Sequence, residues 1–128
     1  MRVLIDTHVF LWAISEPRKL SARARKIITN PNNELILSSL SVWEIILKQQ
    51  QGKLKLPVSA GYLEAHMLHL GIESVLAVQP AHVYGLFELP YFHRDPYDRL
   101  LISQCRTEGL TFLSADLDMQ KYPVKVIW

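Results

Sequence analysis

Two aspartates, Asp95 and Asp98, stand at the start of a stretch whose pattern predicts a helix, Asp-Pro-Tyr-Asp-Arg-Leu-Leu-Ile. Asp95 suits the N-cap, where its carboxylate can accept from unpaired backbone N–H groups, and Pro96 falls at the first helical position. Helical spacing then places Asp98 on one face with Leu101 and Ile102. A carboxylate on an apolar face is costly unless something neutralises it. Asp98 therefore either leans back to its own helix N-terminus or belongs to a larger group of polar side chains.

Three further acids lie shortly after apolar runs that predict strands. Asp6 comes directly after Val3–Ile5, and Asp116 comes one residue after the run 111–114. Glu44 lies one turn into an expected helix that follows a second apolar run. In a parallel sheet, ligands bind outside the carboxyl ends of the strands. We therefore expect all four acids, Asp98 included, to converge on one edge of the sheet.

Each of these acids also has a purely structural interpretation. Asp6 and Asp116 could be helix N-caps, and Glu44 could close a capping box with Ser41 or pair with Lys48 one turn later. Taken together, however, several carboxylates at one edge repel and raise one another's pKa. A divalent cation resolves that conflict. Ligation by oxygen alone favours Mg²⁺ or Mn²⁺ over zinc.

The elements that must position these acids alternate along the chain, which indicates a parallel sheet covered on both faces. Proline, glycine and polar turn residues separate them. Apolar runs predict strands at 3–5, 35–37, 75–78, 111–114 and 124–127. Helical patterns cover about 9–14, 21–29, 38–50, 60–70, 80–88 and 95–108, with a last short helix beginning at Asp116. The inward face of the second helix should carry Ala22, Ala24, Ile27 and Ile28, and the aromatic residues Phe10, Trp12 and Trp43 should pack in the core.

The composition is that of one globular domain of 128 residues, with 49% hydrophobic and 20% charged residues. A net charge of +2 is too small to indicate nucleic-acid binding by itself, and we interpret the basic cluster Arg18–Lys26 as a solvated helix face. The single Cys105 excludes an internal disulfide and fits a reducing compartment. Since no apolar run is long enough to span a bilayer, we expect a cytoplasmic protein. The histidines His66 and His69 lack the flanking residues of a zinc motif.

Four motifs in order resemble a PIN domain, most closely the VapC-type toxin ribonucleases of bacterial toxin–antitoxin pairs. They are Leu-Ile-Asp-Thr-His-Val-Phe-Leu-Trp at 4–12, Ser-Val-Trp-Glu-Ile at 41–45, Asp-Pro-Tyr-Asp-Arg-Leu-Leu-Ile at 95–102 and Leu-Ser-Ala-Asp at 113–116. Each motif is weak alone, but the four together cover the chain. The resemblance implies an α/β fold, a three-layer α/β/α sandwich around a mainly parallel sheet, in one nuclease domain over residues 1–128.

The resemblance also assigns roles by position. It implies that Asp6, Glu44 and Asp98 are the core acids and metal ligands, and that Asp116 is the fourth, more variable acid, with Asp118 a weaker substitute. Thr7 matches a hydroxyl residue that often supports the first aspartate, and Asp95 is a further possible metal ligand.

The activity implied is that of a Mg²⁺- or Mn²⁺-dependent endoribonuclease whose partners are an RNA substrate and a cognate antitoxin protein. Many relatives also form homodimers, and Phe10, Trp12 or Trp43 could supply such surfaces in place of core packing. Basic residues such as Arg94, Arg99 and the cluster Arg18–Lys26 could engage RNA phosphates. Two other classes of function stay open: a nuclease that cuts structured DNA, and a catalytically inert module that acts through protein binding.

Overall fold

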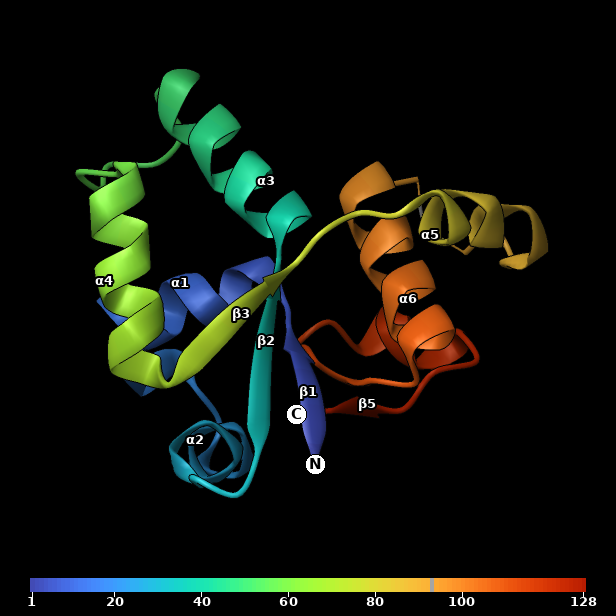
Figure 1. The fold of residues 1–128 in the computed structure, drawn as a ribbon, viewed down its shortest axis with the longest axis horizontal. Coiled ribbons are helices and arrows are strands. Elements are labelled where there is room, and N and C mark those ends of the chain that lie inside the picture. Colours follow the sequence, from blue (N-terminus) through green and yellow to red (C-terminus); the bar gives the residue numbers. More distant parts are fainter. Residues whose placement is uncertain (93) are drawn as a thin grey trace.

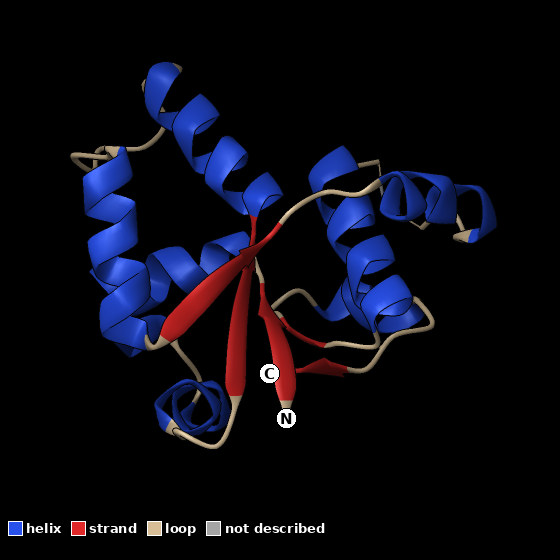
Figure 2. Ribbon diagram, in the orientation of Figure 1, coloured by secondary structure: helices blue, strands red, loops and turns tan. Residues whose placement is uncertain are grey.

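A five-stranded, entirely parallel sheet forms the centre of the computed structural model, which describes residues 1–92 and 94–128 (Figures 1 and 2). His93, two residues before Asp95, lies outside the described residues. The strand order is β3-β2-β1-β4-β5. The strands are β1 (Arg2–Ile5), β2 (Glu34–Ser38), β3 (Ile72–Leu76), β4 (Thr111–Leu113) and β5 (Val126–Ile127). The central position of β1 places the residue that follows it, Asp6, in the middle of the carboxyl edge of the sheet.

Helices cover both faces of this sheet, as the alternation of side chains along β1 requires. The described α-helices are α1 (Thr7–Ser15), α2 (Ala22–Thr29), α3 (Ser39–Gln50), α4 (Ala60–Leu70), α5 (Pro80–Tyr84) and α6 (Pro96–Glu108). Short 3₁₀ turns occupy Pro17–Lys19, Gly85–Glu88 and Leu117–Lys121. The three layers agree with the α/β/α sandwich that the sequence predicts.

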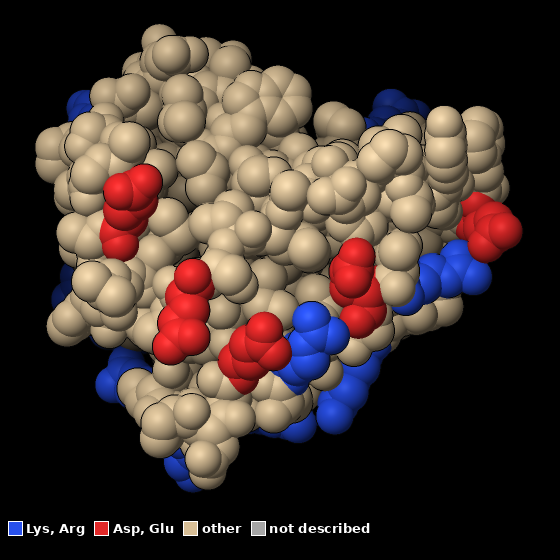
Figure 3. Space-filling view, viewed as in Figure 1, with Lys and Arg blue, Asp and Glu red and all other residues tan. Residues whose placement is uncertain are grey.

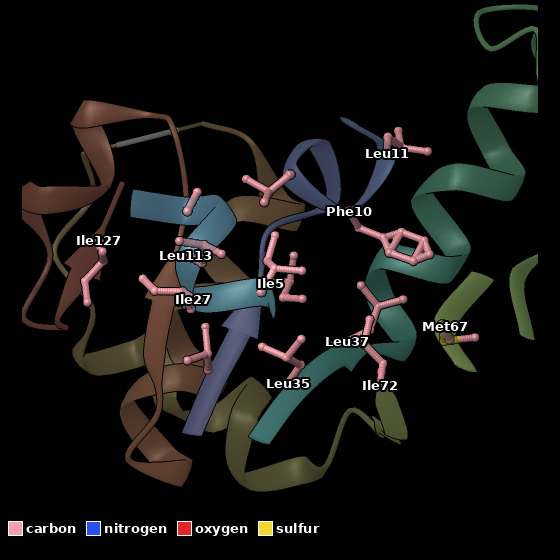
Figure 4. Close-up of a cluster of buried hydrophobic side chains, with 14 of the residues drawn as sticks. Ile5, Phe10, Leu11, Ile27, Leu35, Leu37, Met67, Ile72, Leu113 and Ile127 are labelled. Atoms are coloured by element: carbon pink, nitrogen blue, oxygen red, sulfur yellow. The ribbon is translucent and has the colours of Figure 1, made fainter. Parts of the chain in front are cut away.

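Each face of the sheet has its own hydrophobic cluster. Val3 and Ile5 point into a cluster with residues of α1, α2, α3 and α4, among them the fully buried Phe10 (Figure 4). Leu4 points the other way, into a cluster with Leu101 and Ile102 of α6. Because successive residues of a strand face opposite sides, one short apolar run anchors both helical layers. The acids at the carboxyl edge of the sheet are thus attached to well-packed strands and helices.

The helix ends follow from local sequence signals. Ser21 caps α2 and Ser59 caps α4, each accepting the backbone N–H three residues on. At the start of α6, the Asp95 side chain accepts from the backbone N–H of Tyr97 at 2.9 Å, with Pro96 in the first turn. Gly109 ends α6 with φ +67°, a left-handed conformation that favours glycine. The predicted N-cap at Asp95 is therefore confirmed.

Two predictions about the elements are wrong. The third strand occupies Ile72–Leu76 instead of 75–78, and its residues Glu73 to Val75 are exposed. It is the edge strand of the sheet, so only part of it is covered. Ala22 is also exposed, because it is the first residue of α2 and the helix turns its inward face only from Ala24 onward.

The surface charges are mixed. Figure 3 shows acidic and basic side chains interspersed over the lower half of one face. The basic residues of the cluster Arg18–Lys26 are exposed, and Lys19 pairs with Glu16 at 2.8 Å, as expected for a solvated face. Among the described residues, no helix has the length and apolar character needed to cross a membrane.

Candidate active site

Asp6 is the most deeply placed of the four acids. It directly follows β1, its backbone N–H donates to the carbonyl of Leu113 at 3.0 Å, and the residue is only 5% exposed. Although Asp6 stands at the N-cap position of α1, its carboxylate makes no side-chain capping hydrogen bond, and the backbone of Thr7 acts on it only as a contact that lowers its pKa. Instead, Oδ2 accepts a hydrogen bond of 2.7 Å from the Ser114 hydroxyl. Burial raises the pKa of Asp6 above its ordinary value, and the nearby Glu44 carboxylate raises it further.

Asp98 connects the acids electrostatically. It lies in the first turn of α6 and is half-buried. Its pKa rises to about 8, because of burial first and then because of four neighbouring acids, which are Asp6, Asp95, Glu44 and Asp116. Since Asp95 already caps the helix, Asp98 is not needed for that task. All the predicted acids therefore act on one carboxyl group, as residues at a common edge must.

Glu44 reaches the same edge from α3, which follows β2. It is 6% exposed, and Lys48, one turn later, holds its Oε2 at 3.0 Å. Of the two structural alternatives for Glu44, the pairing with Lys48 is confirmed. The capping box with Ser41 is wrong, because Ser38 is the N-cap of α3 and accepts the backbone N–H of Leu40. The Lys48 ammonium group therefore lies beside the buried Glu44 carboxylate.

Asp116 is exposed and has a structural role of its own. Its Oδ1 accepts the backbone N–H of Asp118 at 3.0 Å, so it caps the 3₁₀ turn that follows, as the structural interpretation of this residue predicts. Its own N–H donates to the Ser114 hydroxyl at 3.2 Å. Asp118 is exposed and pairs with Lys121 at 3.2 Å. Asp116 thus remains connected to Asp6 through one shared hydroxyl group, whereas Asp118 pairs with a lysine of its own turn.

The hydroxyl residues of the site differ from the expectation. Thr7 was the hydroxyl residue matched to support of Asp6, yet its Oγ1 donates to the buried Ser41 Oγ at 2.8 Å and so ties α1 to α3. The hydroxyl that contacts Asp6 belongs to Ser114, which is 2% exposed and 108 residues away in sequence. The only local signal for Ser114 is its position between a strand and Asp116, where a serine commonly forms a turn.

The donor set suits a hard divalent cation. All four acids offer oxygen, and the raised pKa values of Asp6 and Asp98 record the cost of holding carboxyl groups together in a partly buried place. Within residues 1–92 and 94–128, no three His, Cys, Asp or Glu side chains are already gathered closely enough to hold a metal ion. Repulsion among the carboxylates opposes such closeness, and so does the ion pair between Lys48 and Glu44. A bound cation would remove the repulsion among the carboxylates.

Comparisons with known proteins place the chain among characterised relatives. A family model described as PIN domain matches residues 3–125. Ribonuclease VapC22 of Mycobacterium tuberculosis is 27% identical over 124 residues, which are 94% of this chain and 91% of that protein.

Solved structures share the fold. A chain of VapBC2 from Rickettsia felis, solved bound to a DNA fragment from their promoter, matches with a TM-score of 0.72 and 16% identity over 99% of this chain and 98% of that one. DNA-bound VapBC from Salmonella typhimurium gives 0.70 at 15% identity over 99% and 97%. FitAcB from Neisseria gonorrhoeae gives 0.64 at 17% identity over 98% and 96%.

Proposed function

This chain belongs to the PIN domain family, and we propose that it is a metal-dependent endoribonuclease and the toxin of a toxin–antitoxin pair, in one nuclease domain over residues 1–128. The observation that carries the proposal is the electrostatic convergence of Asp6, Glu44, Asp95 and Asp116 on Asp98 at the carboxyl edge of the sheet. The similarity to a protein named ribonuclease over nearly the whole chain supports the choice of RNA.

Asp6, Glu44, Asp98 and Asp116 would hold Mg²⁺ or Mn²⁺. When bound, such an ion neutralises charge on a phosphodiester and lowers the pKa of a bound water. The chain's own contribution is to fix the ligands in place. Ser114 orients the Asp6 carboxylate, and Lys48 holds Glu44 on the inner side of α3. The Asp95 carboxylate caps α6 instead of facing the cation.

Asp98 is the acid whose protonation state should be coupled to cation binding. With a pKa of about 8 in the metal-free protein, it is mostly protonated at neutral pH, and it must lose that proton before it can bind a cation well. Once Asp98 has lost its proton, its carboxylate can also accept a proton from an attacking water. Asp6 and Glu44 are more buried and serve chiefly as ligands.

Cleavage of single-stranded RNA is the expected activity. Protein purified free of any partner should cut a labelled RNA in Mn²⁺, should leave the DNA of matched sequence intact, and should be inactive in EDTA. An Asp6→Asn variant prepared identically controls for contaminating ribonuclease. Cleavage of the DNA instead, above all of structured DNA, would replace the RNA assignment. Failure to cut any nucleic acid would favour the inert binding module.

A cognate antitoxin is the second part of the proposal. Its support is the similarity to VapC22 and the fold shared with chains of VapBC assemblies. The product of the neighbouring small reading frame should co-purify with this chain and should suppress its RNA cleavage, because a protein that covers the acidic edge denies access to phosphate. Size-exclusion chromatography with light scattering gives the stoichiometry and tests the homodimer. Isolation of a freely active monomer that is harmless to its host would count against the antitoxin.

A further inference from the structure

The exposed indole ring of Trp43 is the least expected feature of the acidic edge. Core packing was predicted for Trp43, but 56% of the residue is exposed. It immediately precedes Glu44, which is buried, on α3. Its ring centroid lies 5.2 Å from that of Tyr97, which immediately precedes Asp98 on α6. One aromatic pair therefore bridges the two helices that carry Glu44 and Asp98, and each ring is next in sequence to an acid of the proposed site.

Tyr97 holds this pair in place. It is half-buried and packs against the cluster that contains Leu101 and Ile102, so its ring is anchored to the layer formed by α6. The two rings are tilted by 59°, an arrangement that aromatic pairs favour over a face-to-face sandwich. Because the rings are not stacked face to face, Tyr97 fixes Trp43 without covering both faces of the indole. A rigid, exposed aromatic face loses little conformational freedom when a ligand binds.

A nucleobase is the ligand that these neighbours select. Sites for single-stranded nucleic acid combine aromatic faces, on which bases stack, with cations that attract the backbone. The cation on this helix is Lys48, one turn beyond Glu44; in the free protein it pairs with Glu44 at 3.0 Å, and a metal ion bound by that carboxylate would leave the ammonium group for the RNA backbone. A phosphodiester held at Glu44 and Asp98 would bring its flanking bases close to the residues beside these acids. The aromatic pair consists of the two residues that immediately precede them on α3 and α6.

We propose that Trp43, held by Tyr97, stacks on a base beside the phosphodiester that is cut. This inference rests on the proposed nuclease function. Stacking tolerates any base, so Trp43 would add affinity and positioning for unpaired RNA without selecting a sequence. It would also disfavour a fully paired duplex, whose bases already stack on one another. A protein partner is the competing occupant, because Ile46, three residues on along α3, is 37% exposed.

The test compares Trp43→Ala with Trp43→Phe, which keeps a ring, and with Phe87→Ala, which removes a 90% exposed aromatic outside the site. Steady-state cleavage of a mixed-sequence single-stranded RNA in Mn²⁺ should fall about 10-fold in kcat/KM for Trp43→Ala, mainly through KM. Trp43→Phe should recover most of the loss, and Phe87→Ala should behave as wild type. The rise in melting temperature with Mn²⁺ should be equal in all four proteins, which separates stacking from damage to the acids.

An RNA with one abasic position completes the test once the cut is mapped. An abasic site beside the cut should cost wild type about as much as Trp43→Ala does, and should cost Trp43→Ala nothing more. Independent effects of the two changes would overturn the inference while leaving the nuclease intact. If wild type binds RNA but does not cut it, the same comparison made on dissociation constants decides the stacking role. If wild type neither binds nor cuts RNA, both proposals fail. Loss of antitoxin binding by Trp43→Ala with unchanged RNA kinetics would assign the ring to the protein partner.

Discussion

Replacing Asp98 with asparagine is expected to reduce RNA cleavage to background and, at the same time, to stabilise the metal-free protein at neutral and alkaline pH. The amide keeps the shape of the side chain and removes its charge. It can no longer bind a cation as a carboxylate does or accept a proton. Its stabilising effect follows first from removal of a partly buried charge, and then from relief of repulsion with Asp6, Asp95, Glu44 and Asp116, all of which raise the pKa of Asp98.

The pH dependence has a definite sign. In the unfolded chain Asp98 titrates near 3.8, whereas in the folded, metal-free protein its pKa is about 8. Between these values the folded state binds more protons, so this group lowers the free energy of unfolding as pH rises and its full cost is reached above about pH 8. The stability gained by Asp98→Asn should therefore grow across this interval and level off beyond it. Urea unfolding in EDTA at a series of pH values measures the difference.

Asp95 supplies the matched control on the same turn of α6. Asparagine is an equally good N-cap, so Asp95→Asn should keep both the fold and most of the cleavage rate, whereas Asp95→Ala should cost about 1 kcal/mol of stability. A well-folded but inactive Asp95→Asn protein beside an active Asp98→Asn protein would contradict the assignment. It would mean that Asp95 holds the metal and that Asp98 is structural.

Saturating Mg²⁺ or Mn²⁺ is expected to raise the melting temperature of the protein on the order of 10 °C. Binding to the folded state alone adds about 2.7 kcal/mol at a hundredfold excess over Kd, and a domain of this size gains several degrees for each kcal/mol. Asp6→Asn should remove most of the increase, because Asp6 is the acid buried at the centre of the edge. Differential scanning calorimetry with K⁺ at equal ionic strength separates specific binding from screening.

A titration with Mg²⁺ or Mn²⁺ shows whether binding of the cation is coupled to loss of the Asp98 proton. Protons should be released as the cation binds at neutral pH, and apparent affinity should increase with pH up to about 8. Isothermal titration in two buffers of different ionisation enthalpy counts the protons. A melting temperature that ignores both ions, together with full activity in EDTA, would exclude a metal at this edge.

Local sequence was sufficient wherever the physical interaction is itself local. The start of α6 depends on contacts between Asp95 and the two residues after Pro96, and its end depends on the freedom of Gly109 to adopt a positive φ. The inner residues of β1, β2 and β4 are covered on both faces and are apolar, so the runs 3–5, 35–37 and 112–113 are visible in the sequence. The α/β class and the placement of Asp6 directly after a strand follow from these patterns.

The tertiary structure alone decided which groups meet across the chain. Ser114 reaches Asp6 from 108 residues away, and Thr7 reaches Ser41 from 34, because the strand order brings β4 beside β1 and α3 beside α1. Neither contact has a pattern in the sequence, since a hydroxyl group can pair with any acceptor that the fold presents. The edge position of β3 was likewise hidden, because strand order depends on packing between distant segments.

The exposure of Trp43 was also decided by the tertiary structure. Core packing was expected for this apolar ring, yet the fold leaves 56% of the residue exposed beside Tyr97. The sequence determined that α3 carries Trp43 and Glu44 side by side. The tertiary structure decided that Glu44 is buried near Asp98 and that Trp43 is exposed beside Tyr97, because the orientation of a helix is set by the surfaces on which it packs.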